Sequence, residues 1–297
     1  MRDDDRLRIS VCVVCRNEAD KLPDCLRSAS FADEIVVMDL SSEDGSAAVA
    51  AEHGARVVRH EPVPIVELVR NKVAAEATGT WVLALDPDER VSPGLAAELR
   101  RLSGLDGFDA VSIPRLNRDF GYAAETPLQR YEPQTRFYRR ERVTWPTEPN
   151  ELPAIGRDRL HRLPQRDELV IVHDRNRSIP EALERVIRYA PAEAAALLAS
   201  GETFTARKMI RRVAGKTHKQ FVEARSLEEG MPGLLRAFVL VSFHFHVWAC
   251  FWQLSGAHRT KADDRYLRRL GLPLRLLRAL GAPAKARRLV RRRLRAR

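Results

Sequence analysis

Short apolar runs alternate with helical patterns over residues 7–115, and this alternation predicts the fold. The runs that read as buried strands cover residues 8–14, 34–38, 55–58, 81–85 and 110–113. Helices are expected over residues 21–29, 46–53 and 66–77, and from Ser92-Pro93 onward; the second is entered through the capping residue Asp44. Strand–helix alternation with short connections is typical of parallel crossovers. We therefore expect an α/β fold built on a doubly wound, mostly parallel sheet.

The pattern changes after residue 114. Residues 116–165 carry many prolines and arginines around short strands such as 135–139. From residue 180 onward the chain reads as helical, most clearly over 181–198 and 204–225. We therefore expect an α/β domain over residues 1–179 and an appended C-terminal helical region over residues 180–297.

The two regions differ in charge. Formal charges sum to −5 over residues 1–180 and to +16 over residues 181–297, and residues 259–297 hold 15 Lys/Arg against two Asp. A basic appendage on an acidic domain suggests a segment that meets phosphates, on lipid or on nucleic acid. A nucleic-acid-binding segment would interleave aromatic side chains with the basic ones, and from Lys285 onward there are none. Nucleic acid is therefore not expected as a partner, and a nucleic-acid-binding protein is the weaker alternative.

Two C-terminal segments predict contact with a membrane surface. Residues 237–254 are 18 residues without a formal charge, the threshold for a transmembrane helix. The segment has a polar stripe formed by Ser242, His246 and Gln253. Opposite to it lies an aromatic stripe formed by Phe238, Phe245 and Trp252. These stripes favour a helix that is in-plane, re-entrant or buried in a dimer over a single span. In residues 275–297 leucines alternate with arginines at helical spacing, which predicts an amphipathic helix on anionic lipid; a solvated arginine-rich end is the alternative.

The N-terminus and the cysteines indicate the cytoplasm. The chain begins without the basic start and longer apolar stretch of a secretory signal, so we expect a cytoplasmic protein, peripheral at the inner face of the cell membrane. Cys12 and Cys15 form a Cys-x-x-Cys pair inside the first predicted strand. Residues three apart on a strand point to opposite faces, which argues against a shared metal or a redox pair.

Acidic side chains follow three of the predicted strands, at the sheet edge where ligands bind in such folds. They lie in Arg16-Asn17-Glu18, in Asp39 with Ser41 to Ser46, and in Asp86-Pro87-Asp88-Glu89. Three such clusters at one edge would repel each other unless a cation or hydrogen-bond donors lie among them. The Asp86-x-Asp88 spacing can present two carboxylates to one Mg²⁺ or Mn²⁺, although taken alone it is also an ordinary acidic turn. The Gly-rich fingerprints of dinucleotide enzymes and P-loop NTPases are absent.

Four blocks occur in order along this region: Ile9–Glu18; Asp33–Asp39 with Ser42–Ser46; Arg70-Asn71; and Trp81–Arg90. In these blocks the chain resembles the family 2 glycosyltransferases of GT-A fold, and within them the bacterial group that includes lipopolysaccharide core glucosyltransferases. The likeness is strongest over residues 9–115 and ends before residue 260. It implies an inverting, metal-dependent, hexosyl-type transferase. Such an enzyme moves a sugar from a nucleotide-sugar donor to a lipid-linked or cell-envelope glycan acceptor.

The resemblance also implies roles for single residues. The residues implied to bind the nucleotide-sugar are Asn17, Glu18, Asp39, Arg70 and Asp86. Asp88, with Asp86 beside it, is implied to ligate Mg²⁺ or Mn²⁺, and His173 is a further candidate ligand at the end of a predicted strand. A histidine at the end of a strand that bonds to the backbone would explain His173 equally simply. A salt bridge to an acidic loop would likewise explain Arg70.

The catalytic base is expected in the segment Trp145–Leu152. The family carries a His-Glu pair here, and its glutamate is thought to deprotonate the acceptor hydroxyl. This chain lacks the histidine, and either Glu148 or Glu151 can be the counterpart; we favour Glu148 for its distance from the preceding strand. The missing histidine leaves open a non-catalytic GT-A-like scaffold.

Overall fold

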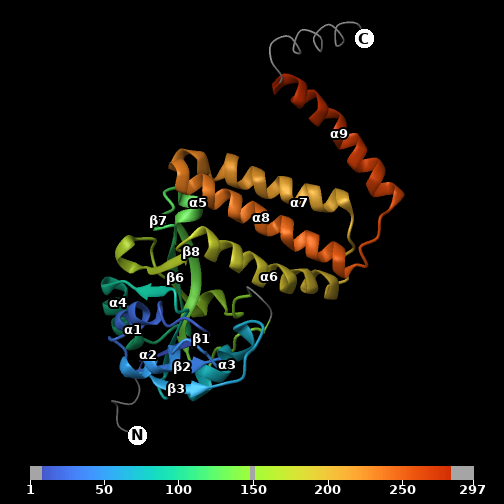
Figure 1. Cartoon of the computed structure of the whole chain (residues 1–297). Coiled ribbons are helices and arrows are strands. Elements are labelled where there is room, and N and C mark those ends of the chain that lie inside the picture. Colours follow the sequence, from blue (N-terminus) through green and yellow to red (C-terminus); the bar gives the residue numbers. More distant parts are fainter. Residues whose placement is uncertain (1–8, 148–150, 282–297) are drawn as a thin grey trace, which may run out of the picture. The chain divides into compact units, whose positions relative to one another are not determined.

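A computed structural model of the chain describes residues 9–147 and 151–281 (Figure 1). The strands are β1 (Ile9–Cys15), β2 (Glu34–Asp39), β3 (Arg56–Arg59), β4 (Trp81–Leu85), β5 (Glu89–Val91), β6 (Ala110–Asp119), β7 (Tyr122–Ala123), β8 (Tyr131–Arg139), β9 (Leu160–Arg162) and β10 (Ile171–Asn176). The helices are α1 (Leu22–Ser28), α2 (Ser46–Glu52), α3 (Glu67–Glu76), α4 (Pro93–Ser103), α5 (Pro127–Arg130), α6 (Ile179–Ala199), α7 (Ala206–His218), α8 (Gly230–Leu254) and α9 (Lys261–Gly281). Short 3₁₀ turns cover Arg157–Arg159, Asp167–Leu169 and Ser226–Glu229, and a π-helical turn covers Lys219–Glu223.

The chain divides into two compact units, residues 1–182 with 224–234 and residues 183–223 with 235–297. The domain boundary predicted between residues 179 and 180 stays a prediction, because compactness in space does not test independent folding.

One ten-stranded sheet forms the frame of the first unit, in the order β3-β2-β1-β4-β8-β6-β10-β5, with β7 and β9 paired to β6. The strands β3, β2, β1 and β4 are parallel. Strand β8 lies antiparallel between β4 and β6, and β10 is parallel to β6. The expected fold class, a GT-A-type α/β sheet with an appended C-terminal helical region, is confirmed.

Helices pack against both faces of the sheet because the strand residues alternate between two cores. Ile9, Val11 and Val13 of β1 share one buried cluster with apolar residues of α1 and α4. Cys12 and Val14 belong to the other cluster, together with apolar residues of α3. A parallel strand that is buried on both faces reads as a continuous apolar run, which is why β1 was recognisable from the sequence.

The cysteines follow the same alternation. Cys12 and Cys15 lie in the two different clusters, which confirms that the Cys-x-x-Cys pair points to opposite faces. Burial raises the pKa of both thiols to about 12. Cys25 is also buried, Cys250 is partly exposed, and none of the four is in a disulfide.

The predicted elements are present, although several of their ends differ, such as that of α7, which ends at His218 rather than at residue 225. Strand β6 continues to Asp119, six residues beyond the predicted end, because β8 and β10 pair with it on both sides. Helix α2 begins after Gly45, which has a φ of 87°, so the expected cap at Asp44 is wrong. The Asp44 carboxylate accepts the Ser46 backbone N–H at 3.0 Å from just outside the helix.

Three long helices form the second unit together with α9. Its core contains Ala190 and Ala194 of α6 and Val247, Trp248 and Phe251 of α8. Within this unit, the Ala206 backbone N–H at the start of α7 donates to Asp263 of α9 at 2.8 Å. The helical region that the sequence predicts after residue 180 is thus present. The part of the predicted tail helix over residues 282–297 lies outside the described residues.

In the part of the chain that the structure describes, one helical stretch, Ser226–Leu254, is long and apolar enough to cross a membrane. Only 28% of its most apolar 18-residue window is buried. The aromatic side chains of the predicted stripe are exposed: Phe238 by 58%, Phe245 by 47% and Trp252 by 38%. The stretch therefore offers an apolar surface, and its relation to a membrane stays a prediction.

Trp81 at the start of β4 offers a test of the packing in the first unit. Its buried indole stacks on Phe137 at 4.6 Å between ring centroids, lies 5.6 Å from Phe108, and donates to the Ser103 carbonyl at 3.1 Å. Trp81→Ala removes these contacts and leaves a cavity. We expect it to lower the free energy of unfolding by roughly 3–5 kcal/mol, measured by urea denaturation with circular dichroism.

Leu105→Ala is the matched control, because the Leu105 side chain is 42% exposed. It should change the free energy of unfolding by about 0.5 kcal/mol or less. Equal urea midpoints for Trp81→Ala and the wild type would contradict the packing described.

Candidate active site

The loops after β1, β2 and β4 lie at one edge of the sheet, because these strands are parallel neighbours. The first two loops are joined through Asn17, which adopts a left-handed φ of 55°. Its backbone N–H donates to the Ser42 hydroxyl at 2.9 Å, and its side-chain carbonyl accepts the Glu43 N–H at 2.8 Å. The backbone N–H of Glu18 donates to the Ser46 hydroxyl at 2.9 Å. These two loops therefore form one hydrogen-bonded surface.

Hydrogen-bond donors satisfy the acids of the second loop. Asp39 is 1% exposed, and both of its carboxylate oxygens lie 3.3 Å from the Ser42 backbone N–H. Asp44 accepts the backbone N–H groups of Ala19 and Ser46 at 3.0 Å each. The sequence left open whether a cation or donor groups would balance the acidic clusters, and for these two residues donor groups do so.

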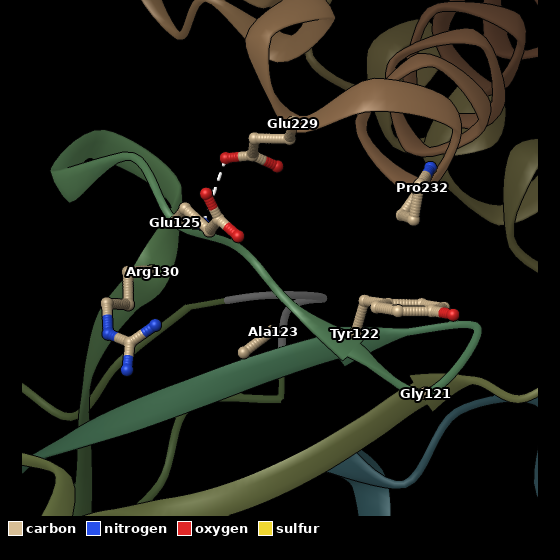
Figure 2. A pocket seen from close by; sticks show the side chains of 7 residues that line it. All are labelled: Gly121, Tyr122, Ala123, Glu125, Arg130, Glu229 and Pro232. Atoms are coloured by element: carbon tan, nitrogen blue, oxygen red, sulfur yellow. Dashed lines mark hydrogen bonds between the residues drawn. The ribbon is translucent and has the colours of Figure 1, made fainter.

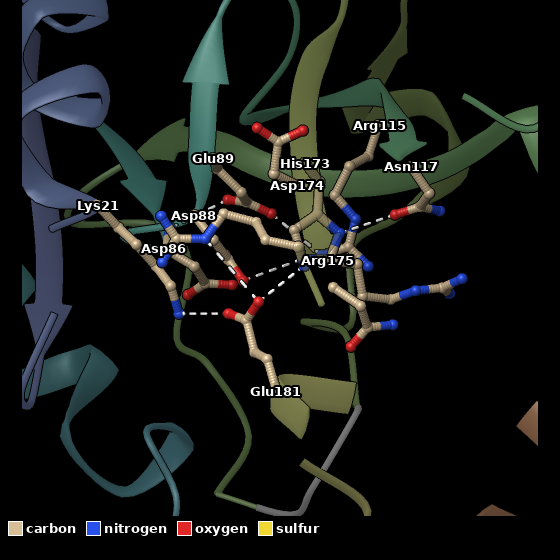
Figure 3. Close-up of polar contacts among 12 residues, drawn as sticks. Lys21, Asp86, Asp88, Glu89, Arg115, Asn117, His173, Asp174, Arg175 and Glu181 are labelled. Carbon is tan, nitrogen blue, oxygen red and sulfur yellow. Dashed lines mark hydrogen bonds and ion pairs between the residues drawn. The ribbon is translucent and has the colours of Figure 1, made fainter. Parts of the chain in front are cut away.

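Arginines balance the third cluster (Figure 3). Arg70 and Arg136 hold the Asp86 carboxylate at 3.1 and 2.7 Å, one on each oxygen. Burial opposes ionisation of Asp86, but the two guanidiniums outweigh it and hold its pKa well below the usual range. Glu89 is fully buried and pairs with Arg115 at 3.0 Å. It also pairs with Arg136 at 3.4 Å. The salt bridge considered as an alternative for Arg70 is therefore present.

The Arg70-Asn71 block also holds Trp145. The Asn71 side-chain amide donates to the Trp145 carbonyl and accepts the Trp145 backbone N–H, both at 2.9 Å. The Arg70 guanidinium lies over the buried indole, 5.1 Å from its centroid. These contacts fix the start of the segment that was predicted to hold the base. Glu148 lies outside the described residues, and Glu151 is exposed.

Asp88 and His173 face each other (Figure 3). The His173 Nε2 lies 3.5 Å from an Asp88 carboxylate oxygen, and the His173 Nδ1 lies 2.7 Å from the Asn117 side-chain oxygen. The Asn117 amide donates to Glu132 at 3.2 Å, which orients its oxygen toward the histidine. Nδ1 therefore carries a hydrogen and Nε2 faces Asp88, so that the neutral form of His173 would direct the Nε2 lone pair toward that carboxylate. This side-chain hydrogen bond replaces the backbone bond considered as the alternative for His173.

A lone pair and a carboxylate that face each other are suited to share a cation. Neighbouring ligands of one ion with bonds of about 2.1 Å lie about 3 Å apart, close to the separation of these two atoms. In residues 9–147 and 151–281 no group of three or more His, Cys, Asp and Glu side chains surrounds a common point. Among the predicted ligands, Asp88 and His173 are therefore the two whose side chains face each other. Asp86 is already engaged by two arginines.

Lys21 links the first loop to the start of α6. Its amine lies 2.7 Å from Glu18 and 2.8 Å from Glu181, and Arg177 pairs with Asp20 beside it. The Glu181 carboxylate also accepts the Arg177 backbone N–H at 2.7 Å. The side chain of Glu18, a predicted nucleotide-binding residue, is therefore positioned from two elements that are far apart in the sequence.

The sequence did not indicate four residues of this site: Lys21, Arg115, Asn117 and Arg136. For Arg136 a signal was present, since it lies between Thr135 and Phe137 in a predicted strand, and an arginine inside a buried strand requires an acidic partner. Arg115 and Asn117 lie in the part of β6 beyond its predicted end, so their position relative to the acids was hidden.

Comparison with known proteins shows what the sheet-edge loops of this site are similar to. Residues 10–155 match the family described as glycosyl transferase family 2. A TPR repeat-containing protein of Synechococcus elongatus is 33% identical over 178 residues, covering 52% of this chain and 44% of that protein. An uncharacterized glycosyltransferase of Rickettsia felis is 32% identical over 95 residues, covering 31% of this chain and 32% of that protein. The matches thus span less than half the length of these curated relatives.

Among solved structures, the mannosyltransferase of Pyrobaculum calidifontis in complex with GDP-Man and Mn²⁺ is 17% identical, with a TM-score of 0.44 and coverage of 96% of this chain and 83% of that one. Glucosyl-3-phosphoglycerate synthase of Mycobacterium tuberculosis is 19% identical, with a TM-score of 0.43 and coverage of 67% and 82%. The family match covers the four blocks on which the resemblance was based, apart from Ile9. Residues 10–155 of this chain, slightly less than half of its length, are therefore similar to glycosyl transferase family 2.

Proposed function

We propose that the chain transfers a hexose-type sugar, with inversion, from a nucleotide-sugar donor to a lipid-linked or cell-envelope glycan, with Mg²⁺ or Mn²⁺ bound. The family of residues 10–155 supports the transferase class. The observation that carries the proposal is that Asp88 and His173 face each other, with the histidine ring held by Asn117, so that the two could share a cation. A hydrogen-bonded partner that fixes the tautomer is the usual environment of a metal-binding histidine.

The donor would bind on the joined loops. Asn17, Glu18 and Asp39 lie where the first two loops meet, and we assign the base and ribose to them. Their backbone and side chains are already held by hydrogen bonds, so little conformational entropy would be lost on binding. Asp86, oriented by Arg70 and Arg136, is assigned to the ribose side of the metal site.

Unused hydrogen-bond donors support a negatively charged ligand near Asp86. Among the described residues, Nε of Arg70 and both Nε and Nη1 of Arg136 are buried without a hydrogen-bond partner. A buried donor without an acceptor costs roughly 1–3 kcal/mol. Diphosphate oxygens would provide acceptors, and we assign Arg70 to the donor phosphates on this basis.

The chain's own groups would then perform the acid–base chemistry. A glutamate of the segment after Trp145, Glu148 or its alternative Glu151, would take the proton of the acceptor hydroxyl as that oxygen attacks the anomeric carbon. The anchored Trp145 would hold the segment near the donor. When bound, the divalent ion supplies charge neutralisation for the departing diphosphate. One displacement at the anomeric carbon inverts its configuration.

The second unit would hold the enzyme at the inner face of the cell membrane, next to a lipid-linked acceptor such as a lipopolysaccharide core. The exposed aromatic side chains of α8 offer apolar surface. Helix α7 adds the basic residues Arg207, Lys208, Arg211, Arg212 and Lys216. Apolar and basic side chains together are typical of proteins that adsorb to anionic lipid.

The metal site is tested with Asp88→Asn, which keeps the shape of the side chain and removes its charge. We expect Mn²⁺-dependent binding of a nucleoside diphosphate to weaken by about 10–100-fold, since a neutral amide is a poorer ligand for a divalent ion. Isothermal titration with UDP, GDP, ADP and CDP, in Mn²⁺ and in EDTA, measures this. Asp106→Asn is the control, because the Asp106 side chain is 99% exposed on another loop. Equal Mn²⁺-dependent binding by Asp88→Asn and the wild type would refute the site.

The base is tested with Glu148→Gln and Glu151→Gln. Removing a positioned general base should lower turnover by about 10²–10⁴ and leave nucleotide affinity nearly unchanged. We expect Glu148→Gln to have this effect and Glu151→Gln to do much less, in a single-turnover assay with donor in excess. If Glu151→Gln is the inactive variant, the base lies three residues later than proposed. If both variants keep full turnover, neither residue is the base.

Deletion of residues 275–297 tests the membrane contact. The segment holds ten Lys/Arg and no acid, and each basic side chain near an anionic surface contributes about 1 kcal/mol, less as they crowd. Sedimentation with phosphatidylserine vesicles should show a sharp loss of binding that added salt mimics in the full chain. Phosphatidylcholine vesicles are the control, and turnover on a small soluble acceptor should survive. Equal binding by both proteins at low salt would show that the segment is no anchor.

A further inference from the structure

A pocket lies within the first unit at the β6–β7 hairpin, lined in part by Gly121, Tyr122 and Ala123. Strand β7 pairs antiparallel with the end of β6, with Ala123 opposite Arg118. The next residue, Ala124, donates its backbone N–H to the Asn117 carbonyl at 3.4 Å. Asn117 is the residue that orients His173. Strand β6 pairs with β7 and also with β10, the strand that carries His173, so β6 connects this pocket to the proposed metal ligand.

The pocket has one apolar and one polar wall (Figure 2). The Tyr122 ring and Pro232 lie on one side, and the side chains of Glu125, Arg130 and Glu229 lie on the other. The cavity measures about 270 Å³. Pockets for drug-sized ligands measure about 300–1,000 Å³, so this one suits a single small unit.

The turn that presents Tyr122 is unusual in its backbone. Asp119 of β6 pairs with Tyr122 of β7, so only Phe120 and Gly121 connect the two strands. Their φ values are 56° and 85°, as a type I′ turn requires. A bulky residue such as phenylalanine is rarely found with positive φ, and it is held here by a hydrogen bond of 2.6 Å from its N–H to the Asn176 carbonyl. Strain of this kind is typical of sites where a side chain must be placed for function.

The polar wall is also fixed by the fold. A Glu229 carboxylate oxygen accepts the backbone N–H groups of Glu125 and Thr126 at 2.9 and 3.0 Å. Arg130 donates to the Ala124 carbonyl at 3.2 Å. The pocket therefore exists before any ligand arrives.

The chemistry of the walls points to a neutral sugar. An aromatic ring that is 61% exposed packs well against the apolar C–H face of a pyranose, while carboxylates and a guanidinium hydrogen-bond its hydroxyls. The two carboxylates, Glu125 and Glu229, outnumber the single guanidinium of Arg130, which also pairs with Asp167. A phosphate or carboxylate on the ligand would meet like charge here, and like-charge contacts are unfavourable.

We propose that this hairpin pocket binds a neutral monosaccharide unit of the acceptor, with Tyr122 as its stacking platform. The inference rests on the proposed transferase function. It makes the β6–β7 hairpin the element that selects the acceptor, while the loops after β1, β2 and β4 select the donor.

The test uses the full chain and the methyl glycosides of glucose, galactose and mannose, with glucose 6-phosphate as the anionic comparison. Binding is measured by saturation-transfer NMR. At least one methyl glycoside should bind to the wild type, and glucose 6-phosphate more weakly than methyl glucoside. Tyr122→Ala should lower the affinity by about tenfold, the worth of one good aromatic contact, and Tyr122→Phe should retain it. Binding of nucleoside diphosphate with Mn²⁺, measured on the same variants, should not change.

Equal affinity of the wild type and Tyr122→Ala overturns the inference, and so does a wild type that binds nucleotide but none of the glycosides. If glycosides bind through Tyr122 while no nucleoside diphosphate binds to the wild type, the pocket stands as a sugar site and the transferase proposal fails. A third outcome is that Tyr122→Ala and Tyr122→Phe both lose nucleotide binding as well as glycoside binding. The side chain would then have a structural role, and the inference would be overturned.

Discussion

The buried guanidinium of Arg136 is the contact on which the candidate site depends. It lies between Asp86 and Glu89, two acids of one loop that are brought close together at the end of β4. Without a cation between them, two such carboxylates would repel each other. Breaking a buried pair by removing one partner costs roughly 3–5 kcal/mol, because the other charge is left uncompensated. The antiparallel strand β8, which carries Arg136, is therefore as necessary to the acidic loop as the parallel strands are.

Two kinds of interaction organise the edge of the sheet. The loops after β1 and β2 are joined to each other by hydrogen bonds from backbone amides to serine hydroxyls, to Asn17 and to carboxylates. The loop after β4 is held mainly by ion pairs with arginines. Both kinds of contact fix the shape of the edge, and the proposed metal ligands Asp88 and His173 face each other there. Holding donor-binding and metal-binding groups in place before the substrates arrive is a general means of lowering a reaction barrier.

The sequence was sufficient for the parallel half of the fold and for much of the site. Strands β1 and β4 are buried and β2 is largely so, and they read as apolar runs. Asn17, Glu18, Asp39, Asp86 and Asp88 lie at the carboxyl ends of these three strands as predicted. The position of β8 could not be predicted, because its pairing with β4 joins residues more than fifty positions apart and leaves no local pattern. For the same reason the sequence indicated a cation among the acids but not that arginines would supply most of the positive charge.

The state of the cysteines has a practical consequence. Three of the four thiols are buried, and in Cys12 and Cys15 the high pKa leaves almost no thiolate at neutral pH. Only Cys250, on α8, is partly accessible. A maleimide fluorophore or nitroxide would therefore attach to the native chain at one position, on the apolar helix itself. No cysteine needs to be removed first, and the probe would report directly on the polarity around that helix in buffer and on vesicles.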